Sequence, residues 1–375
     1  MRLFDSVDYR RISWPTIMLA GMLLAIGLAF VFSASTDGGP QPQKQVVWSI
    51  VGLFVFLVVI LIDYKLLVDW AYVIYGAGLV LLLATLFLAS PIKGSRRWID
   101  LGPAQLQTSE FMKIAVIFAL ARFLPGRDSY RELIGLLSPF IIVIVPIAFI
   151  AKQPDLGTSL VLLPVFLGMV FVAGARVKHL ITFVLMGILA LPVLWFMIEP
   201  YQKERVISFI NQDSKDPALL MDELYHLTQA KVAIGSGGLT GKGWGQGTQN
   251  RLNFLPERNT DFIFAVICDE WGFLRAVGVL ALFFLFFCSC ASVADATRDP
   301  PGRLLVVGVM LLFATQMLVN TGMSAGQFPT VGLPLPFMSY GGSSLLASFV
   351  GLGLVVNVSM RPQIVLGREM LDEIR

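Results

Sequence analysis

The sequence KGWGQGTQNRLNFLPERNTD (residues 242–261) is a polar, glycine-bearing stretch that ends on the carboxylate of Asp261. An apolar run from Phe262 to Ala294 follows at once and is long enough for about 50 Å of helix. An acidic group at such a boundary can act on a substrate that has one polar end and one lipid end. This placement of Asp261 organises the rest of the sequence.

The composition is that of an integral membrane protein. Hydrophobic residues make up 56% of the chain and charged residues 14%, with a mean hydropathy of +0.76, whereas about a quarter of residues are charged in soluble domains. A bilayer core of about 30 Å needs roughly 20 apolar residues per helix. The sequence therefore predicts an all-α, polytopic membrane fold in a single domain over residues 1–375, with about ten spans: Pro15 to Ala34, Gln45 to Ile62, Trp70 to Ala89, Thr108 to Leu124, Leu133 to Ala151, Leu156 to Ala175, His179 to Ile198, Phe262 to Ala294, Arg303 to Thr321 and Met338 to Met360.

The distribution of Lys and Arg predicts the orientation, because short cytoplasmic loops carry an excess of these residues. An even number of spans puts both termini on one side, and most basic residues near span ends fall there, so we expect cytoplasmic termini. The loop of about residues 199–261 is then extracytoplasmic. Lys93, Arg96 and Arg97 break the trend on the outer side. They are either tolerated exceptions or ligands for an anion.

The extracytoplasmic loop contains a helical pattern followed by glycines. Apolar residues recur at spacings of three and four, which predicts an amphipathic helix on the membrane surface: Leu220, Leu224, Leu227, Ala230 and Ile234. The glycines of GSGGLTGKGWGQG (residues 235–247) allow close backbone approach to a ligand or form a flexible hairpin. This stretch is not a GxxxxGK[ST] phosphate loop, because no Ser or Thr follows Lys242.

Glu110 and Lys113 are charged residues inside a predicted span. Such charges are costly by roughly 2.5 to 3.5 kcal/mol and usually face a protein cavity. Their i, i+3 spacing puts them on one helical face, so they form either a structural pair or part of a ligand site. Thr108 and Ser109 are expected to cap this helix.

Asp261 also has two interpretations. Thr260 or Asp261 could cap the eighth helix. Alternatively, Asp269, Glu270 and Arg275 in the first half of the run indicate a wet vestibule with Asp261 at its rim.

Several other functions are excluded. The cysteines Cys268, Cys288 and Cys290 all fall in the eighth span, so no disulfide staples the external loop. The chain has only two histidines, which rules out a zinc-type cluster. No basic stripe with interleaved aromatic residues points to nucleic acid.

Six blocks of the sequence, in register over nearly the whole chain, resemble the shape, elongation, division and sporulation (SEDS) membrane glycosyltransferases of bacterial peptidoglycan synthesis. They are GSRRWIDLG (94–102), QTSEFMKIA (107–115), KQPDLGTS (152–159), YHLTQAKVAIGSGGLTGKGWGQGTQ (225–249), LPERNTDFIFAV (255–266) and GLPLPFMSYGGSS (332–344). The block GSGGLTGKGW with GTQ and LPER is similar to the elongation branch rather than the division branch. Cys268 to Trp271 depart from the family pattern.

The resemblance implies a reaction and a location. Lipid II, a disaccharide-peptide on undecaprenyl pyrophosphate, is polymerised into glycan at the outer face of the bacterial cytoplasmic (inner) membrane. The GlcNAc 4-hydroxyl of the acceptor attacks C1 of the donor MurNAc, and undecaprenyl pyrophosphate leaves. Asp261, in the TDF block, is expected to accept the hydroxyl proton, which is typically worth about 10²–10⁴-fold.

The resemblance also implies the residues around the substrate. Cations stabilise the departing pyrophosphate best in a partly dry site. The expected ones are Arg96, Lys113, Arg205, Lys242 and Arg258, of which Lys113 and Arg258 are the best placed, and a divalent cation (Mg²⁺ or Mn²⁺) is a candidate to share the task. The expected lining residues are Trp98, Glu110, Asp155, Glu257 and Ser339. For three of them a second role stays open: Trp98 could anchor at the interface, Asp155 could cap a helix, and Ser339 could begin the tenth span.

The expected partners are lipid II, membrane lipids, elongation complex proteins and a class B penicillin-binding protein. The last would supply crosslinking, since the chain has no Ser-x-x-Lys arrangement in an external domain. Two other functions stay open, a flippase or transporter for lipid-linked sugars and a noncatalytic scaffold for a transpeptidase.

Overall fold

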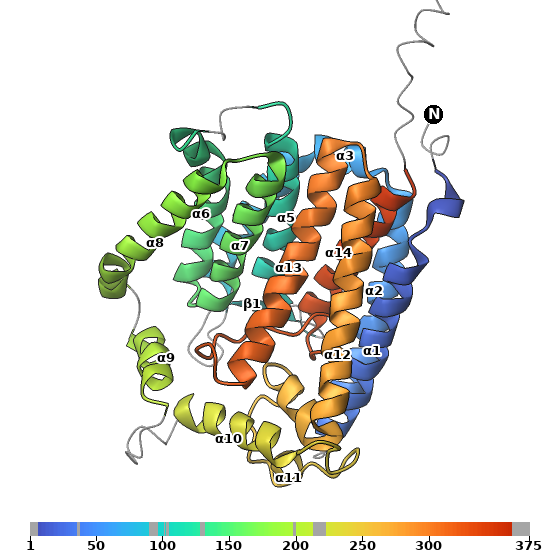
Figure 1. The fold of residues 1–375 in the computed structure, drawn as a ribbon, viewed down its shortest axis with the longest axis vertical. Coiled ribbons are helices and arrows are strands. Elements are labelled where there is room, and N and C mark those ends of the chain that lie inside the picture. Colours follow the sequence, from blue (N-terminus) through green and yellow to red (C-terminus); the bar gives the residue numbers. More distant parts are fainter. Residues whose placement is uncertain are drawn as a thin grey trace, which may run out of the picture.

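The computed structural model describes residues 7–35, 38–89, 97–100, 102, 105–127, 132–197, 200–212 and 223–361. The chain forms a helical bundle with one short β-hairpin (Figure 1). The helices are α1 (Trp14–Ala34), α2 (Gln41–Leu61), α3 (Tyr64–Asp69), α4 (Ala71–Leu88), α5 (Thr108–Phe123), α6 (Leu137–Lys152), α7 (Leu156–Ala173), α8 (Val177–Met197), α9 (Pro200–Ile210), α10 (Glu223–Ser236), α11 (Thr248–Arg251), α12 (Ile263–Ala296), α13 (Pro300–Ser324) and α14 (Gly342–Ser359), with single 3₁₀ turns at Tyr9–Arg11 and Ile134–Leu136.

The predicted polytopic helical fold is confirmed, and every predicted span corresponds to a helix. Within the described ranges, eight helices are long and apolar enough to cross a membrane. Two predicted spans are not among these eight helices: α5, with 16 residues, and α8 (Val177–Met197), which contains the apolar stretch Val177–Pro192.

Helix α5 is short because it lies inside the protein. Most of its residues from Thr108 to Ala121 are buried, and it packs on α4, α13, α14, α6 and α7. Glu110 and Lys113 therefore face protein rather than lipid. The expected cap is wrong: the N-cap residue is Gln107, and its side chain makes no capping bond. Thr108 instead hydrogen-bonds to Thr85 at 2.9 Å.

The two ends of the described chain meet at one end of the bundle. The backbone N–H of Asp8 donates to the carbonyl of Met360 at 2.8 Å, and the N–H of Ser13 donates to the hydroxyl of Ser359 at 3.3 Å. Helices α10 and α11 lie at the opposite end (Figure 1). This arrangement fits an even number of crossings.

The β-hairpin is an addition to the predicted all-α fold. Strands β1 (Trp98–Asp100) and β2 (Gln105–Gln107) pair antiparallel, with Trp98 opposite Gln107. Strand β2 leads directly into α5, and the N–H of Gln107 donates to the hydroxyl of Ser343 in α14 at 2.9 Å. The hairpin is thereby fixed to the bundle.

Helix α10 differs from the expected membrane-surface helix. Its apolar residues Leu224, Leu227, Ala230 and Ala233 are buried at 2% exposure or less, and α10 packs against α12. The helical period was predicted correctly, but the apolar face covers protein instead of lipid. Leu220, the first residue of the predicted pattern, lies outside the described residues.

The long run after Asp261 is not one continuous helix, because Gly272 breaks it with φ 74° and ψ −179°. In an unbroken helix the N–H groups of residues 273 and 274 would donate to the carbonyls of residues 269 and 270. Here they donate to the carbonyls of Gly238 (2.8 Å) and Leu239 (3.1 Å). The carbonyls of Asp269 and Glu270 accept instead from the N–H groups of Lys242 (3.1 Å) and Gly243 (2.9 Å).

The glycine-rich stretch after α10 therefore docks into the break in α12. A Cβ on Gly237 would lie 1.9 Å from the carbonyl oxygen of Cys268, and one on Gly241 would lie 2.2 Å from that of Glu270. Real Cβ atoms do not approach so closely, so both positions require glycine. The flexible-hairpin interpretation of this stretch is wrong.

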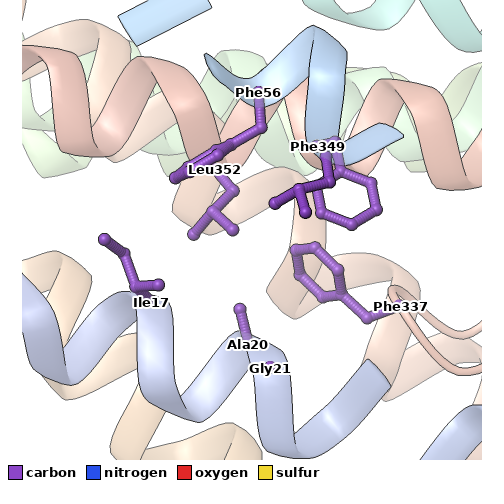
Figure 2. A pocket seen from close by; sticks show the side chains of 8 residues that line it. Ile17, Ala20, Gly21, Phe56, Phe337, Phe349 and Leu352 are labelled. Atoms are coloured by element: carbon purple, nitrogen blue, oxygen red, sulfur yellow. The ribbon is translucent and has the colours of Figure 1, made fainter. Parts of the chain in front are cut away.

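A small apolar cavity of about 90 Å³ lies between α1, α2 and α14 (Figure 2). Phe337 reaches into it from the segment that connects α13 to α14. Its ring packs on the rings of Phe286, Phe313 and Phe349 at centroid distances of 5.4 to 6.2 Å. The remaining lining residues are Ile17, Ala20, Gly21, Leu53, Phe56 and Leu352.

Candidate active site

Asp261 lies in a backbone turn just before α12. The N–H groups of residues 260, 261 and 262 all lie 3.1 to 3.3 Å from the carbonyl of Glu257. The N-cap residue of α12 is Phe262, and no side chain caps the helix. The capping interpretation of Thr260 and Asp261 is therefore wrong, and the carboxylate is available for another role.

Asp261 as a whole residue is partly exposed, and its carboxylate lies in a largely desolvated environment. No hydrogen bond or ion pair joins it to another residue of the described ranges. Burial raises the pKa of Asp261 to about 6; the Glu257 carboxylate also raises it, whereas Arg205 and Arg97 lower it. A carboxyl with this pKa is ionised at neutral pH and is still a better proton acceptor than an ordinary aspartate.

The same electrostatic neighbourhood unites several predicted site residues. The pKa of Asp261 is shifted by the charges of four residues: Glu257, Arg205, Arg97 and Asp155. Arg97 was expected, with Lys93 and Arg96, to be either a tolerated exception or a ligand for an anion, and its positive charge lowers the pKa of Asp261. Arg96 lies outside the described residues.

Asp155 is buried at 1% exposure and caps α7 by accepting from the N–H of Thr158 at 3.2 Å. Its other oxygen accepts from the amide of Gln107 at 3.0 Å. The guanidinium of Arg97 is 3.9 Å away and also donates to the carbonyl of Pro154. The capping role is confirmed, and Asp155 holds Arg97 in place as well.

Trp98 is partly buried on β1, the strand that follows Arg97. The structure thus brings it to the Asp155 side of the bundle through the hairpin. Its stacking on a sugar stays a prediction.

Glu110 and Lys113 form an ion pair of 2.8 Å, and both side chains are almost fully buried. The predicted helical face is correct. Because the ammonium group of Lys113 already contacts a carboxylate, the structure gives it a structural partner; contact with substrate stays a prediction.

Lys242 contacts Asp269 with a distance of 2.5 Å between Nζ and Oδ1. The same ammonium group donates to the hydroxyls of Ser236 and Thr248 at 2.6 Å each. Asp269 also accepts from the N–H of Gln249 at 3.3 Å. Lys242 thus balances a buried carboxylate in the docked glycine stretch, and its predicted contact with pyrophosphate would compete with this pairing.

Glu270 is fully buried and is satisfied by polar groups of the loop and of α1. It accepts from the hydroxyl of Ser33 (2.6 and 2.7 Å), the amide of Asn250 (3.2 Å) and the N–H of Gly245 (2.9 Å). The predicted wet vestibule is therefore wrong for Asp269 and Glu270. Both carboxylates fix the loop instead of lining a water-filled space.

Arg258 and Ser339 are also engaged with the protein. Arg258 is 9% exposed, and its guanidinium donates to the carbonyl of Asn250 at 2.9 Å and to the side chain of Asn253. Ser339 is 4% exposed and donates to the carbonyl of Thr260 at 2.6 Å. It precedes α14 rather than beginning it.

A metal site does not emerge from the described residues, since no three His, Cys, Asp or Glu side chains gather there in a way that could hold an ion. The predicted divalent cation thus has no ready-made set of protein ligands in these ranges.

The fold and this site define a polytopic helical membrane protein with an acid of raised pKa in the turn just before α12. Residues 12–364 match the FtsW/RodA/SpoVE family, described as cell cycle proteins. The chain belongs to this family, as the sequence predicted.

Similar proteins extend this result. The chain is 36% identical over 346 residues to the peptidoglycan glycosyltransferase MrdB of Escherichia coli K12, with 92% of each chain covered. It is 35% identical over 357 residues to a probable peptidoglycan glycosyltransferase FtsW of Trichlorobacter lovleyi, again with 92% of each covered. Both relatives are named as peptidoglycan glycosyltransferases, the second as a probable one.

Two solved structures share the fold. One is a chain of a peptidoglycan synthase complex that coordinates polymerization and crosslinking, with a TM-score of 0.80, 31% identity, and 92% of this chain and 97% of that chain covered. The other is the rod shape determining protein RodA of Thermus thermophilus, with a TM-score of 0.71, 30% identity, and 96% and 99% covered.

Proposed function

We propose that this protein is a peptidoglycan glycosyltransferase that polymerises lipid II, with Asp261 as the general base. The observation that carries the proposal is Asp261, a partly exposed residue whose carboxylate does not cap α12 and has a pKa raised to about 6. The activity of the similar proteins supports the reaction class.

In the proposed reaction, Asp261 accepts the proton of the acceptor GlcNAc 4-hydroxyl while the oxygen bonds to C1 of the donor MurNAc. The bond from C1 to the pyrophosphate oxygen breaks, and its electron pair leaves with undecaprenyl pyrophosphate. Arg205 and Arg97 lower the pKa of Asp261 by their charge. They are therefore the cations we propose to stabilise the negative charge that develops on the pyrophosphate. Lys113, Lys242 and Arg258 would have to exchange the partners they hold. A divalent cation, Mg²⁺ or Mn²⁺, stays a candidate to bind with the pyrophosphate.

The surrounding biology is proposed on the same basis. The protein would act in the bacterial cytoplasmic membrane with cytoplasmic termini, and its site would face outward because α10 and α11 lie at the opposite end from the termini. A class B penicillin-binding protein is the proposed partner, supported by the likeness to a chain of a synthase complex. The elongation role is supported by the likeness to a rod shape determining protein.

The test is polymerisation of lipid II by the purified protein, with and without its partner. Wild-type protein should make glycan polymer, and Asp261→Asn should abolish it while the protein stays folded. Asp295→Asn is the matched control, because Asp295 is exposed near the far end of α12 and this variant should polymerise normally. Polymer from Asp261→Asn would exclude the base, and lipid translocation without polymer would favour a flippase.

A further inference from the structure

The backbone of the Asp261 turn is held by three consecutive hydrogen bonds from other parts of the chain. The carbonyl of Asn259 accepts from the N–H of Tyr340 at 2.8 Å. The carbonyl of Thr260 accepts from the hydroxyl of Ser339 at 2.6 Å, and that of Asp261 accepts from the side-chain amide of Asn320 at 2.9 Å. Two of the three donors are side chains and can be removed individually.

Asn320 joins two segments with one amide group. Its Nδ2 also donates to the carbonyl of Leu333 at 2.7 Å, and the residue is fully buried in α13. Both partners are acceptors, so only the NH₂ group can face them. Its Oδ1 has no hydrogen-bond partner among the described residues. A buried amide that leaves its oxygen unpaired contributes through its two donor bonds.

Ser339 uses its hydroxyl in both directions. It donates to Thr260 and accepts from the N–H of Leu335 at 2.8 Å. The single hydroxyl proton is therefore not available to a sugar. The backbone carbonyl of Ser339 accepts from the buried amide of Gln45 at 3.1 Å, which ties the same segment to α2.

The segment between α13 and α14, which supplies Ser339 and Tyr340, is itself anchored by packing. Phe337 has a φ of 63°, a backbone conformation that non-glycine residues rarely adopt. Its buried ring packs among Phe286, Phe313 and Phe349 at the apolar cavity of Figure 2. The surrounding packing must hold this backbone in place. Gly332, at the start of the segment, lies so close to Asp261 that a Cβ there would be 3.4 Å from Oδ2.

We propose that Asn320 and Ser339 are positioning residues that hold the Asp261 carboxylate in its reactive place through its backbone. This inference rests on the proposed function and reassigns Ser339 from substrate contact to positioning. Misplacing a reacting group by about 1 Å can cost about 10²-fold in rate, so the loss of either donor should act on kcat.

The test compares Asn320→Leu and Ser339→Ala with wild type in lipid II polymerisation. Each variant should lower kcat about 10- to 100-fold with little change in KM, and Ser339→Thr should recover most of it. The acid limb of the pH profile should move to lower pH, because a looser turn exposes the carboxylate to water.

Asn357→Leu is the matched control. Asn357 is equally buried and donates to the carbonyls of Val59 at 2.6 Å and Ile60 at 3.3 Å, but it lies toward the end of α14 that meets the N-terminal segment. Asn357→Leu should lower the stability of the protein. The acid limb of the pH profile of kcat, measured on the protein that remains folded, should stay where it is in wild type. Unchanged kcat in Asn320→Leu and Ser339→Ala, or a purely KM effect of Ser339→Ala, would overturn the proposal.

Hydrogen exchange keeps this inference separate from the proposed function. The amides of residues 260–262 should exchange faster in Asn320→Leu and Ser339→Ala than in wild type or Asn357→Leu. Unchanged exchange would overturn the positioning role of Asn320 and Ser339, whether or not the protein polymerises lipid II. Faster exchange in the variants, together with a wild-type protein that makes no polymer, would support the hydrogen bonds from Asn320 and Ser339 as the restraint on the Asp261 turn and reject the proposed function.

Discussion

Lys242 and Asp269 pair at 2.5 Å beside the break that Gly272 makes in α12. The ion pair fixes the side chains of the docked loop, and the four exchanged backbone bonds fix its main chain. Part of the helical hydrogen-bond ladder of α12 is thereby replaced by bonds to the loop after α10, which form an interlock between the two segments. The same loop continues to Asn250, whose carbonyl accepts a hydrogen bond from the guanidinium of Arg258.

Lys242→Met should destabilise the protein, because it leaves the buried carboxylate of Asp269 without its cation. With the Lys242 side chain 24% exposed, we expect a loss of about 1–3 kcal/mol. Adding Asp269→Asn should recover most of the loss in a thermal unfolding assay. If Lys242→Met unfolds like wild type but polymerises poorly, the pyrophosphate role would be the better explanation.

Gly237→Ala should lower the melting temperature, since its Cβ would meet the carbonyl of Cys268 at 1.9 Å. Overpacking of this kind costs about 1–3 kcal/mol. Gly235→Ala is the control, because a Cβ there meets nothing within 4 Å and alanine favours the helix by about 1 kcal/mol. Equal effects at the two positions would contradict the interlock.

Lys113→Met should cost about 3–5 kcal/mol, because it leaves Glu110 buried without a partner. The double variant Glu110→Gln with Lys113→Met should recover the melting temperature, since no isolated charge remains. If Lys113 also contacts substrate, polymerisation should stay low in the double variant. Full recovery of polymerisation would reduce the pair to a structural role.

The rate of polymerisation should fall as pH falls through about 6, the pKa to which burial raises Asp261. A protonated carboxyl cannot accept the hydroxyl proton, so kcat/KM should decrease about tenfold per pH unit below this value. A profile that stays flat down to pH 4.5 would contradict a base with this pKa.

Asp261→Asn should stabilise the folded protein at neutral pH. Burial raises the pKa of Asp261 from 3.8 to about 6, so the folded state keeps a proton that the unfolded state has lost between these values. Stability falls as pH rises through this window and stays lower above it. The variant should therefore gain about 1–3 kcal/mol at pH 7.5 and little near pH 4, as measured by thermal unfolding.

Much of the fold could be predicted because the membrane constrains it. The bilayer core requires a run of apolar residues in each span, so the ten predicted spans follow from hydropathy. The short helices α3, α9 and α11 were not predicted. Glu110 and Lys113 fell on one face by helical geometry, and the TDF block singled out Asp261. These features are local in sequence.

The arrangement of the loop could not be predicted, because it depends on contacts between distant segments. Hydropathy cannot distinguish a face that covers lipid from one that covers protein, which is why α10 was misplaced. Nor could hydropathy reveal that Gly272 breaks α12 or that Lys242 forms an ion pair with Asp269.

The sequence by itself determined a multi-span helical protein with an acid at a helix entrance, since apolar run length and local spacing control both. Only the tertiary structure decided that Asp261 does not cap α12, that Arg97 acts on it, and that Asn320 and Ser339 hold its backbone. The physical reason is that hydrogen bonds and desolvation depend on which groups meet in space, and here those groups come from α13, the hairpin and the segment before α14.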